Sequence, residues 1–162
     1  MKTKLFCIAA ATAALIGGAA HAADYVNIVI EKEVNASADT VWKKVGGFCA
    51  LKEWLKLPDC NIVSGSGDIG TVRALNGGKI NEVMIAKGQY SYAYAFPNPN
   101  PTFYHGTLTV IPMGAAKSKI NYILFYDQES LGTPEAKAES RATRTKRFTE
   151  AVDNMKAMSE AK

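Results

Sequence analysis

Two ionisable side chains in the middle of the chain are candidates for binding chemistry. Arg73 and Glu82 lie in two successive strand-like runs separated by an Asn-Gly-Gly turn signal. Side chains alternate between the two faces of a strand, so Glu82 shares a face with Ile80 and Met84, which favours an inward-facing carboxylate. The planar guanidinium of Arg73 could hold a carboxylate or a phenolate, and Glu82 could accept a hydrogen bond or act as a general base if burial raises its pKa. The alternative is that Arg73 and Glu82 pair with each other across neighbouring strands.

Tyrosine is concentrated in the same region, because six of the seven tyrosines lie between residues 90 and 126. Strand alternation groups them with aliphatic side chains on shared faces: Tyr92 with Tyr94, Tyr104 with Leu108, and Tyr122 with Leu124. An apolar cavity with several phenol hydroxyls and one Arg/Glu pair would suit an amphiphile with a polar end. The alternative is that these tyrosines are ordinary core residues with their hydroxyls at the edge.

The expected cavity lining combines these strands with a short helix and a long C-terminal helix. It consists of Trp54, Arg73, Glu82, Met84, Tyr92, Tyr94, Tyr104, Leu108, Tyr122, Leu124, Ala142 and Thr145. Trp54 could cap the cavity mouth, or it could simply pack against a disulfide. His105 faces away from Tyr104 by alternation, so we interpret it as a surface residue.

The N-terminus resembles a secretory signal. Lys2 and Lys4 precede an apolar run over residues 5–16, and Ala20-His21-Ala22 offers a small-residue cleavage site. The run is shorter than the roughly 20 apolar residues that span a bilayer. We therefore expect a signal peptide over residues 1–22, one domain over residues 23–162, and a periplasmic or secreted protein.

Cys49 and Cys60 remain after such a cleavage. An even pair in an exported protein favours a disulfide, and closing so short a loop would contribute roughly 3 kcal/mol in the chain-entropy model. A metal or redox site is the alternative, although the pair is not Cys-x-x-Cys.

Several function classes are disfavoured by composition. The net charge of +4 falls to +2 once Lys2 and Lys4 are removed, which gives no reason to expect a nucleic-acid partner. The mature chain has one histidine and no phosphate loop, dinucleotide fingerprint or Gly-x-Ser-x-Gly elbow, so we expect neither a metal nor a cofactor. The basic residues Arg141, Arg144, Lys146 and Arg147 are interpreted as a solvated helix face, with a lipid-headgroup patch as the alternative. We expect no membrane association beyond lipid exchange.

The order of elements follows from hydrophobic alternation and from Gly and Pro punctuation. After a first strand around residues 26–33, Ser37 is a good N-cap for a helix that ends at Gly46-Gly47, and a second short helix is expected over residues 50–55. Strands are then expected over residues 61–66, 71–76, 79–87, 89–96, 104–112 and 119–126, with a proline-rich loop over residues 97–101.

A long helix closes the chain. Thr133 and Pro134 are typical of a helix start, and no Gly or Pro follows. The inward stripe is small in its first half (Ala138, Ala142, Thr145) and bulky afterwards. We interpret the small half as leaving room between helix and sheet; close packing is the alternative.

Together these elements predict an α+β fold, a strongly bent antiparallel sheet of about seven strands with helices on one face. The sequence resembles the START-related, polyketide cyclase/dehydrase and lipid-transfer superfamily (SRPBCC), whose fold is the helix grip. The matching stretches are Ala38-Asp39-Thr40-Val41-Trp42, Gly47-Phe48, Trp54, Gly70-Thr71-Val72-Arg73, Glu82, Tyr90-Ser91-Tyr92, Tyr104, Thr107-Leu108-Thr109-Val110 and Val152-Asp153-Asn154-Met155-Lys156.

The resemblance implies a ligand cavity on the face that carries Glu82, Tyr92 and Tyr104, since similar positions line the pocket in the abscisic acid receptors of this superfamily. The Phe-Cys-Ala-x-x-x-Trp stretch at residues 48–54, with Cys60, is similar to an exported bacterial branch that has a bridge between these cysteines. One departure is that Leu55-Lys56 follows the tryptophan where members often have His-Pro.

Two functions fit this reading. The first is binding or transport of a small hydrophobic or amphiphilic ligand, such as a lipid or a polyketide-like or aromatic molecule, in an internal cavity. The second is a cyclase/dehydrase-like enzyme in which Glu82 or a tyrosine moves a proton and Arg73 steadies an enolate. A filled-core interaction domain is a third possibility. Fold resemblance alone does not separate them.

Overall fold

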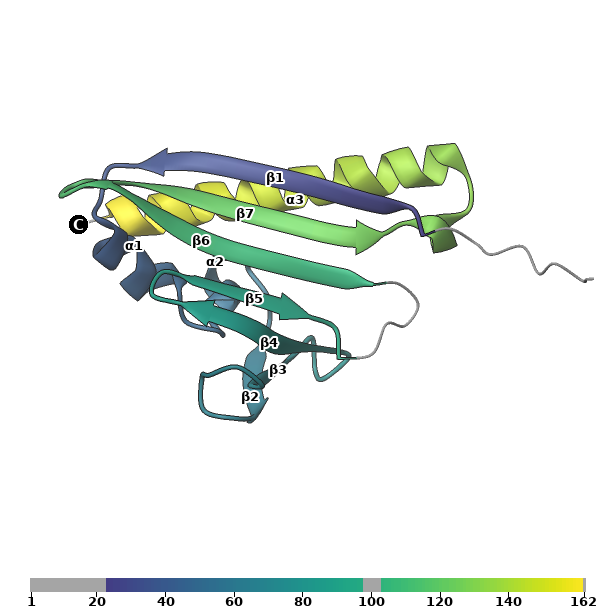
Figure 1. Cartoon of the computed structure of the whole chain (residues 1–162), viewed down its shortest axis with the longest axis horizontal. Coiled ribbons are helices and arrows are strands. Elements are labelled where there is room, and N and C mark those ends of the chain that lie inside the picture. The colour runs from purple at the N-terminus through teal and green to yellow at the C-terminus, as the bar shows by residue number, and fades with distance from the viewer. Residues whose placement is uncertain (1–22, 98–102, 162) are drawn as a thin grey trace, which may run out of the picture.

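The computed structural model describes residues 23–97 and 103–161, which form one antiparallel sheet with helices on its concave side (Figure 1). The elements in chain order are β1 (Tyr25–Val34), α1 (Ala38–Val45), α2 (Leu51–Trp54), β2 (Cys60–Ser64), β3 (Val72–Leu75), β4 (Ile80–Gly88), β5 (Ser91–Ala95), β6 (Tyr104–Gly114), β7 (Lys117–Asp127), the 3-10 turn η1 (Glu129–Leu131) and α3 (Pro134–Glu160). The predicted α+β helix-grip fold is confirmed. The predicted signal peptide lies outside the described residues, as does most of the predicted proline-rich loop.

The sheet order is β1-β7-β6-β5-β4-β3-β2, with every neighbouring pair antiparallel. Consecutive strands from β2 to β7 are therefore neighbours, as short hairpin connections require. At the β3–β4 turn, Asn76, Gly77 and Gly78 all have positive φ, a conformation that Asn and Gly adopt at little cost. This turn fixes the register that places Arg73 opposite Glu82.

Both principal helices begin at the predicted caps. The side chain of Ser37 accepts a hydrogen bond from the backbone N–H of Thr40 at 3.2 Å, and that of Thr133 accepts one from Ala136 at 3.2 Å. The second is followed by Pro134 as the first residue of α3. Each cap satisfies an N–H that would otherwise lack a partner within its helix.

The core lies between the concave face of the sheet and the second half of α3. The buried residues of α3 are Phe148, Ala151, Val152, Met155 and Ser159. This helix packs against β1, β7, α1 and α2 (Figure 1). The ring of Phe148 stacks on Tyr122 of β7 with centroids 5.2 Å apart. None of the described helices is both long and apolar enough to span a membrane.

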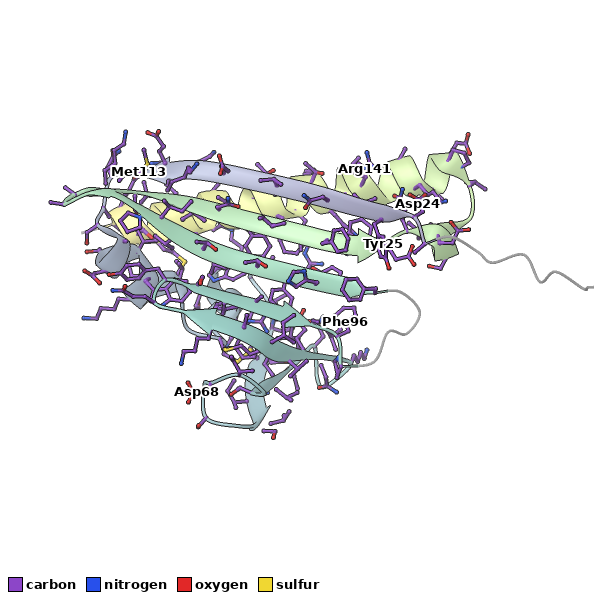
Figure 2. All side chains as sticks on the ribbon, viewed as in Figure 1. Asp24, Tyr25, Asp68, Phe96, Met113 and Arg141 are labelled. Carbon is purple, nitrogen blue, oxygen red and sulfur yellow. A yellow bond between two sulfur atoms is a disulfide. The ribbon has the colours of Figure 1, made fainter. Side chains whose placement is uncertain are left out.

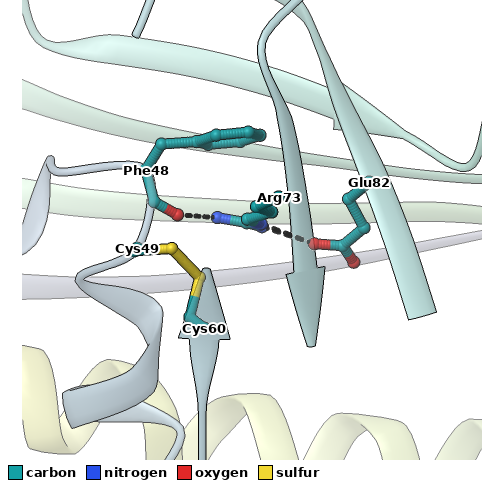
Figure 3. Close-up of a disulfide and its surroundings, with 5 residues drawn as sticks. All are labelled: Phe48, Cys49, Cys60, Arg73 and Glu82. Carbon is teal, nitrogen blue, oxygen red and sulfur yellow. Dashed lines mark hydrogen bonds and ion pairs between the residues drawn. A yellow bond between two sulfur atoms is a disulfide. The ribbon is translucent and has the colours of Figure 1, made fainter. Parts of the chain in front are cut away.

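The disulfide predicted from the cysteine pair is present between Cys49 and Cys60, whose Cα atoms are 5.5 Å apart. It joins the segment before α2 to the first residue of β2 (Figure 3). With 11 residues of sequence separation, it is expected to stabilise the fold by roughly 3 kcal/mol in the chain-entropy model.

Candidate functional site

Arg73 and Glu82 form a buried ion pair between β3 and β4 (Figure 3). Nε and Nη2 of Arg73 each lie 2.7 Å from Oε2 of Glu82, and Nη1 donates a hydrogen bond to the carbonyl oxygen of Phe48. Arg73 is 0% exposed and Glu82 is 5% exposed. The alternative in which these two residues pair with each other is the arrangement that the structure shows.

Aromatic rings enclose the guanidinium of Arg73. Its Cζ lies 4.1 Å from the ring centroid of Phe48, 4.6 Å from that of Tyr94 and 5.7 Å from that of Tyr92. Such contacts favour a desolvated cation. Because Nε and Nη1 donate hydrogen bonds, Nη2 lies in the ion pair and three aromatic rings surround the group, Arg73 is held in the core rather than presented to a ligand.

The electrostatics of the pair follow from this burial. Burial raises the pKa of Glu82 above its ordinary value, although the charge and hydrogen bonds of Arg73 oppose this rise. For Arg73, burial lowers the pKa, but Tyr92 and Glu82 raise it by more, and the guanidinium stays protonated. Glu82 is thus a carboxyl group with greater proton affinity than a surface glutamate.

A cluster of phenols lies beside this pair on the concave face. The hydroxyl groups of Tyr94 and Tyr122 are 2.6 Å apart, and the rings of Tyr94 and Tyr104 are 6.2 Å apart. Burial raises the pKa of Tyr104 to about 12 and the pKa values of Tyr94 and Tyr122 well above the ordinary value. These phenols are therefore neutral at physiological pH and can donate hydrogen bonds.

Gly106 on β6 makes room for the phenol of Tyr94, because a Cβ atom at this position would overlap the Tyr94 ring. The sequence reading missed this residue. An isolated glycine inside a strand pattern was the available signal, since it often marks a close approach of another group.

A recess of about 110 Å³ lies between α2, the β3–β5 strands and the middle of α3. Its lining consists of Leu51, Leu55, Leu57, Leu75, Asn76, Ile80, Glu82, Tyr94, Phe96, Tyr104, Arg144, Arg147 and Phe148. Of the predicted cavity residues, Glu82, Tyr94 and Tyr104 meet here. The recess is walled mainly by aliphatic and aromatic side chains, with a carboxyl group and two phenols inside.

Most of the other predicted cavity residues are buried in the core and do not line the recess. They are Trp54, Arg73, Met84, Tyr92, Leu108, Tyr122 and Leu124. The Trp54 ring packs edge-on against Tyr122 at 5.8 Å, and its carbonyl oxygen accepts a hydrogen bond from Asn154 of α3. Trp54 also lines a separate hollow of about 250 Å³ beside α3.

Ala142 and Thr145, predicted to face the cavity, are exposed and lie on a flank of α3. They line a groove of about 840 Å³ together with Asp24, Gln128, Pro134, Lys137, Ala138, Arg141 and Lys146. Figure 2 shows Asp24, which immediately precedes β1, and Arg141 of α3 at the same end of the molecule. The predicted room beside the small half of the helix therefore takes the form of a groove open to solvent.

Arg144 and Arg147 lie on the other flank of α3 and were interpreted from sequence as part of a solvated face. Both line the recess, and both also line an outer groove of about 430 Å³. The guanidinium carbon of Arg144 is 4.5 Å from the ring centroid of Tyr126 and 5.4 Å from that of Tyr104. The available signal was their spacing, because Arg144 precedes the inward-facing Phe148 by four residues.

The chain matches the model of a known family over residues 25–160, which is nearly the whole described domain. That family is described as polyketide cyclase / dehydrase and lipid transport. The chain belongs to this family. The resemblance to SRPBCC proteins inferred from the motifs is thereby confirmed. No curated protein matches the chain in sequence.

Solved structures support the same fold. Norcoclaurine synthase from Thalictrum flavum, in complex with dopamine and hydroxybenzaldehyde, has a TM-score of 0.63 at 20% identity, covering 97% of this chain and 96% of that chain. The Zhui aromatase/cyclase from Streptomyces sp. R1128 has a TM-score of 0.67 at 11% identity, covering 85% and 94%. XoxI from Bacillus cereus has a TM-score of 0.64 at 19% identity, covering 81% and 93%. At these identities the likeness concerns the fold alone.

Within the described residues, no group of three or more His, Cys, Asp or Glu side chains is placed to hold a metal ion. The chemistry that the recess offers is that of its own side chains. Glu82 can accept a proton or a hydrogen bond, the phenols can donate hydrogen bonds, and the two arginines can bind an anion.

Proposed function

We propose that the protein binds a small amphiphilic molecule in the recess between the concave face of the sheet and α3. The observation that carries this proposal is the division of α3. Residues 134–147 lie along the sheet without a single buried side chain, whereas five residues are buried between Phe148 and Ser159. A helix that covers a sheet without filling the space beneath it leaves room for another molecule.

The lining of the recess supports the same function. Ligand sites are mostly apolar with a few convergent polar groups, and here Glu82, Tyr94 and Tyr104 meet among aliphatic walls. Membership in a family of cyclases, dehydrases and lipid-transport proteins agrees with a hydrophobic ligand.

The volume of the recess sets a condition on binding. Ligand sites commonly measure about 300–1,000 Å³, so a recess of about 110 Å³ admits only a short apolar segment. A larger ligand requires residues 134–147 to move outward. That half of α3 is suited to such a movement because segments with few buried apolar contacts open at low free-energy cost.

Octanol, an uncharged eight-carbon amphiphile, provides a direct test by calorimetric titration of the purified protein. We expect saturable binding that is lost in Ile80→Trp, because Ile80 lines the recess and the larger ring fills it. The matched control is Ile85→Trp on the same strand, since Ile85 is 45% exposed and should tolerate the ring. Absence of octanol binding, or equal binding by both variants, would contradict the proposed site.

A second candidate function is catalysis of proton transfer, favoured by the raised pKa of Glu82 within the recess. The Glu82 carboxylate would accept a proton from a carbon next to a carbonyl group, and the neutral phenol of Tyr94 or Tyr104 would donate a hydrogen bond to the developing oxyanion. Arg73 is already committed to Glu82 and Phe48, so the phenols suit this second role better.

The enzymatic candidate is tested by NMR with 1-phenylbutane-1,3-dione in D₂O. Wild-type protein should accelerate exchange of the acidic methylene protons, and Glu82→Gln should abolish the acceleration while circular dichroism shows a retained fold. Because that variant strands the Arg73 charge, the double variant Arg73→Met/Glu82→Gln serves as a second check. Acceleration over the uncatalysed exchange that persists in either folded variant rules out Glu82 as the base.

We also propose that the protein is exported. The Cys49–Cys60 disulfide is compatible with an oxidising compartment. If residues 1–22 are a signal peptide, protein recovered from the periplasm or medium should begin at Ala23 by intact-mass measurement. A mass that includes residues 1–22 would contradict this boundary.

A further inference from the structure

Arg144 and Arg147 occupy the junction between the inner recess and the outer groove. The two hollows share three lining residues, namely these two arginines and Phe148. A molecule entering the recess from this flank of α3 therefore passes both guanidinium groups. Phe148 below them marks the beginning of the apolar interior.

Neither arginine has an ion-pair partner among the residues that the structure describes. By contrast, Lys137 on the same helix bonds Asp24 at 2.9 Å and lies 3.4 Å from Glu129. Glu82 also lines the recess, and the charge of Arg147 slightly opposes the rise in its pKa that burial causes, but Oε2 of Glu82 is already held by Arg73. Glu139 lines the outer groove with both arginines but forms no ion pair with either, so within the described residues no direct ion pair neutralises the positive charge at the mouth of the recess.

Arg144 shows the clearest deficit. Its Nε is buried and has no hydrogen-bond partner within the described part of the chain. The side chain lies against the rings of Tyr104 and Tyr126, which support a cation but accept no conventional hydrogen bond. A buried charged donor without a partner is costly, and two arginines three residues apart on a helix repel each other. An anion bound between them would relieve both costs.

We propose that the ligand is an anionic amphiphile whose carboxylate binds Arg144 and Arg147 and whose apolar part enters the recess. This inference rests on the proposed function and adds the charge and orientation of the ligand. A carboxylate is the anion of choice because a guanidinium binds it through two parallel N–H···O hydrogen bonds. The apolar part would contact the aliphatic walls, and a hydroxyl or carbonyl group further along it would reach Glu82, Tyr94 or Tyr104.

The test compares octanoate with octanol, which have the same chain length and differ in the head group. We expect the wild-type protein to bind octanoate at least tenfold more tightly than octanol, since charge-assisted hydrogen bonds are about twice as strong as neutral ones. The double variant Arg144→Gln/Arg147→Gln should lose at least tenfold in octanoate affinity and a smaller factor in octanol affinity, because octanol carries no charge for the arginines to bind.

The matched control is Arg141→Gln/Lys146→Gln. It removes the same number of positive charges from the same helix, but from residues that line the groove on the opposite flank. We expect octanoate affinity to remain within about twofold of wild type in this variant. Thermal unfolding of both variants shows whether each is folded, and retained saturable octanol binding shows that the recess is still formed.

The outcomes separate this inference from the proposed function. Octanol binding with octanoate no tighter would overturn the anionic ligand and leave the recess as the binding site. Failure of both probes would overturn both proposals. An equal loss of octanoate affinity in the two double variants would overturn the inference, because it would indicate a general effect of helix charge. Binding of the wild-type protein to anionic vesicles would then support a membrane-binding patch instead.

Discussion

The two halves of α3 have the same secondary structure but different relations to the sheet. From Phe148 to Ser159 the helix buries five side chains against β1, β7, α1 and α2. From Pro134 to Arg147 it buries none and is flanked by grooves on both sides. We call residues 148–159 the anchored half of α3 and residues 134–147 its arm. The arm is held by the Thr133 cap and by the ion pair of Lys137 with Asp24.

The difference indicates that one half of α3 stabilises the fold and that the other half leaves space for a ligand. In the anchored half, apolar burial stabilises the fold, at roughly 1.5–3 kcal/mol for each large side chain. In the arm, Arg144 rather than an apolar side chain lies against the sheet, over the rings of Tyr104 and Tyr126. Space that a bulky apolar residue would fill remains open to a ligand.

The largest expected effect contrasts two arginines given the same substitution. Arg73→Met should lower the free energy of unfolding by about 3–5 kcal/mol, because it leaves Glu82 buried without its partner. Arg144→Met should change it by less than about 1 kcal/mol, because no carboxylate is stranded and only ring contacts are lost. Urea denaturation measures both free energies of unfolding. Similar losses in the two variants would contradict the distinction between Arg73, which is ion-paired in the core, and Arg144, which has no ion-pair partner among the described residues.

A second contrast concerns packing along the helix. Met155→Ala should cost about 2–5 kcal/mol, since Met155 is fully buried and its removal leaves a cavity. Thr145→Ala in the arm should change the free energy of unfolding by no more than about 0.5 kcal/mol, because Thr145 is exposed. A cost above 1 kcal/mol at Thr145 would show that the arm packs more closely than described.

The smallest expected effect is the pH dependence of the contribution that Glu82 makes to the free energy of unfolding. Because burial raises the pKa of Glu82 in the folded protein above that in the unfolded chain, the folded state holds this proton more tightly. The contribution of Glu82 to stability is therefore fully present below its unfolded pKa and declines as the pH rises through the folded pKa. The free energy of unfolding of wild type minus that of Glu82→Gln should therefore fall as the pH rises above 4.5, the ordinary pKa of glutamate. A difference that rises over this range would mean that Arg73 lowers the pKa more than burial raises it.

Much of this fold could be predicted from sequence because local signals agreed with one another. The Asn76-Gly77-Gly78 turn, the Thr133-Pro134 cap and the alternation within β6 and β7 each pointed to the observed element. The turn also fixes the pairing of Arg73 with Glu82. From the sequence alone, pairing of Arg73 with Glu82 could not be preferred to binding of a ligand by either residue. A shift of two residues in the strand register would keep both side chains on the same face but give Arg73 a different partner.

The candidate site was predicted less completely, for a geometric reason. Strand alternation assigns a face but not a depth, so Glu82, which lines the recess, and Leu108, which is buried in the core, were indistinguishable. On α3, Ala142 and Thr145 are exposed and line a groove on the flank opposite Arg144, beside Asp24 and Gln128, rather than the recess. Arg144 looked like a surface residue because a sequence does not show how far a helix lies from the sheet beneath it.

Hydrogen exchange of α3, measured by mass spectrometry with and without octanoate, tests the central claim most directly. Without ligand, the amides of residues 134–147 should exchange faster than those of residues 148–160, because the arm lacks buried contacts. With saturating octanoate, exchange in residues 134–147 should slow by at least tenfold, while the anchored half changes little. Uniform exchange along α3, or octanoate protection confined to other elements, would contradict the account that the arm of α3 covers the binding site.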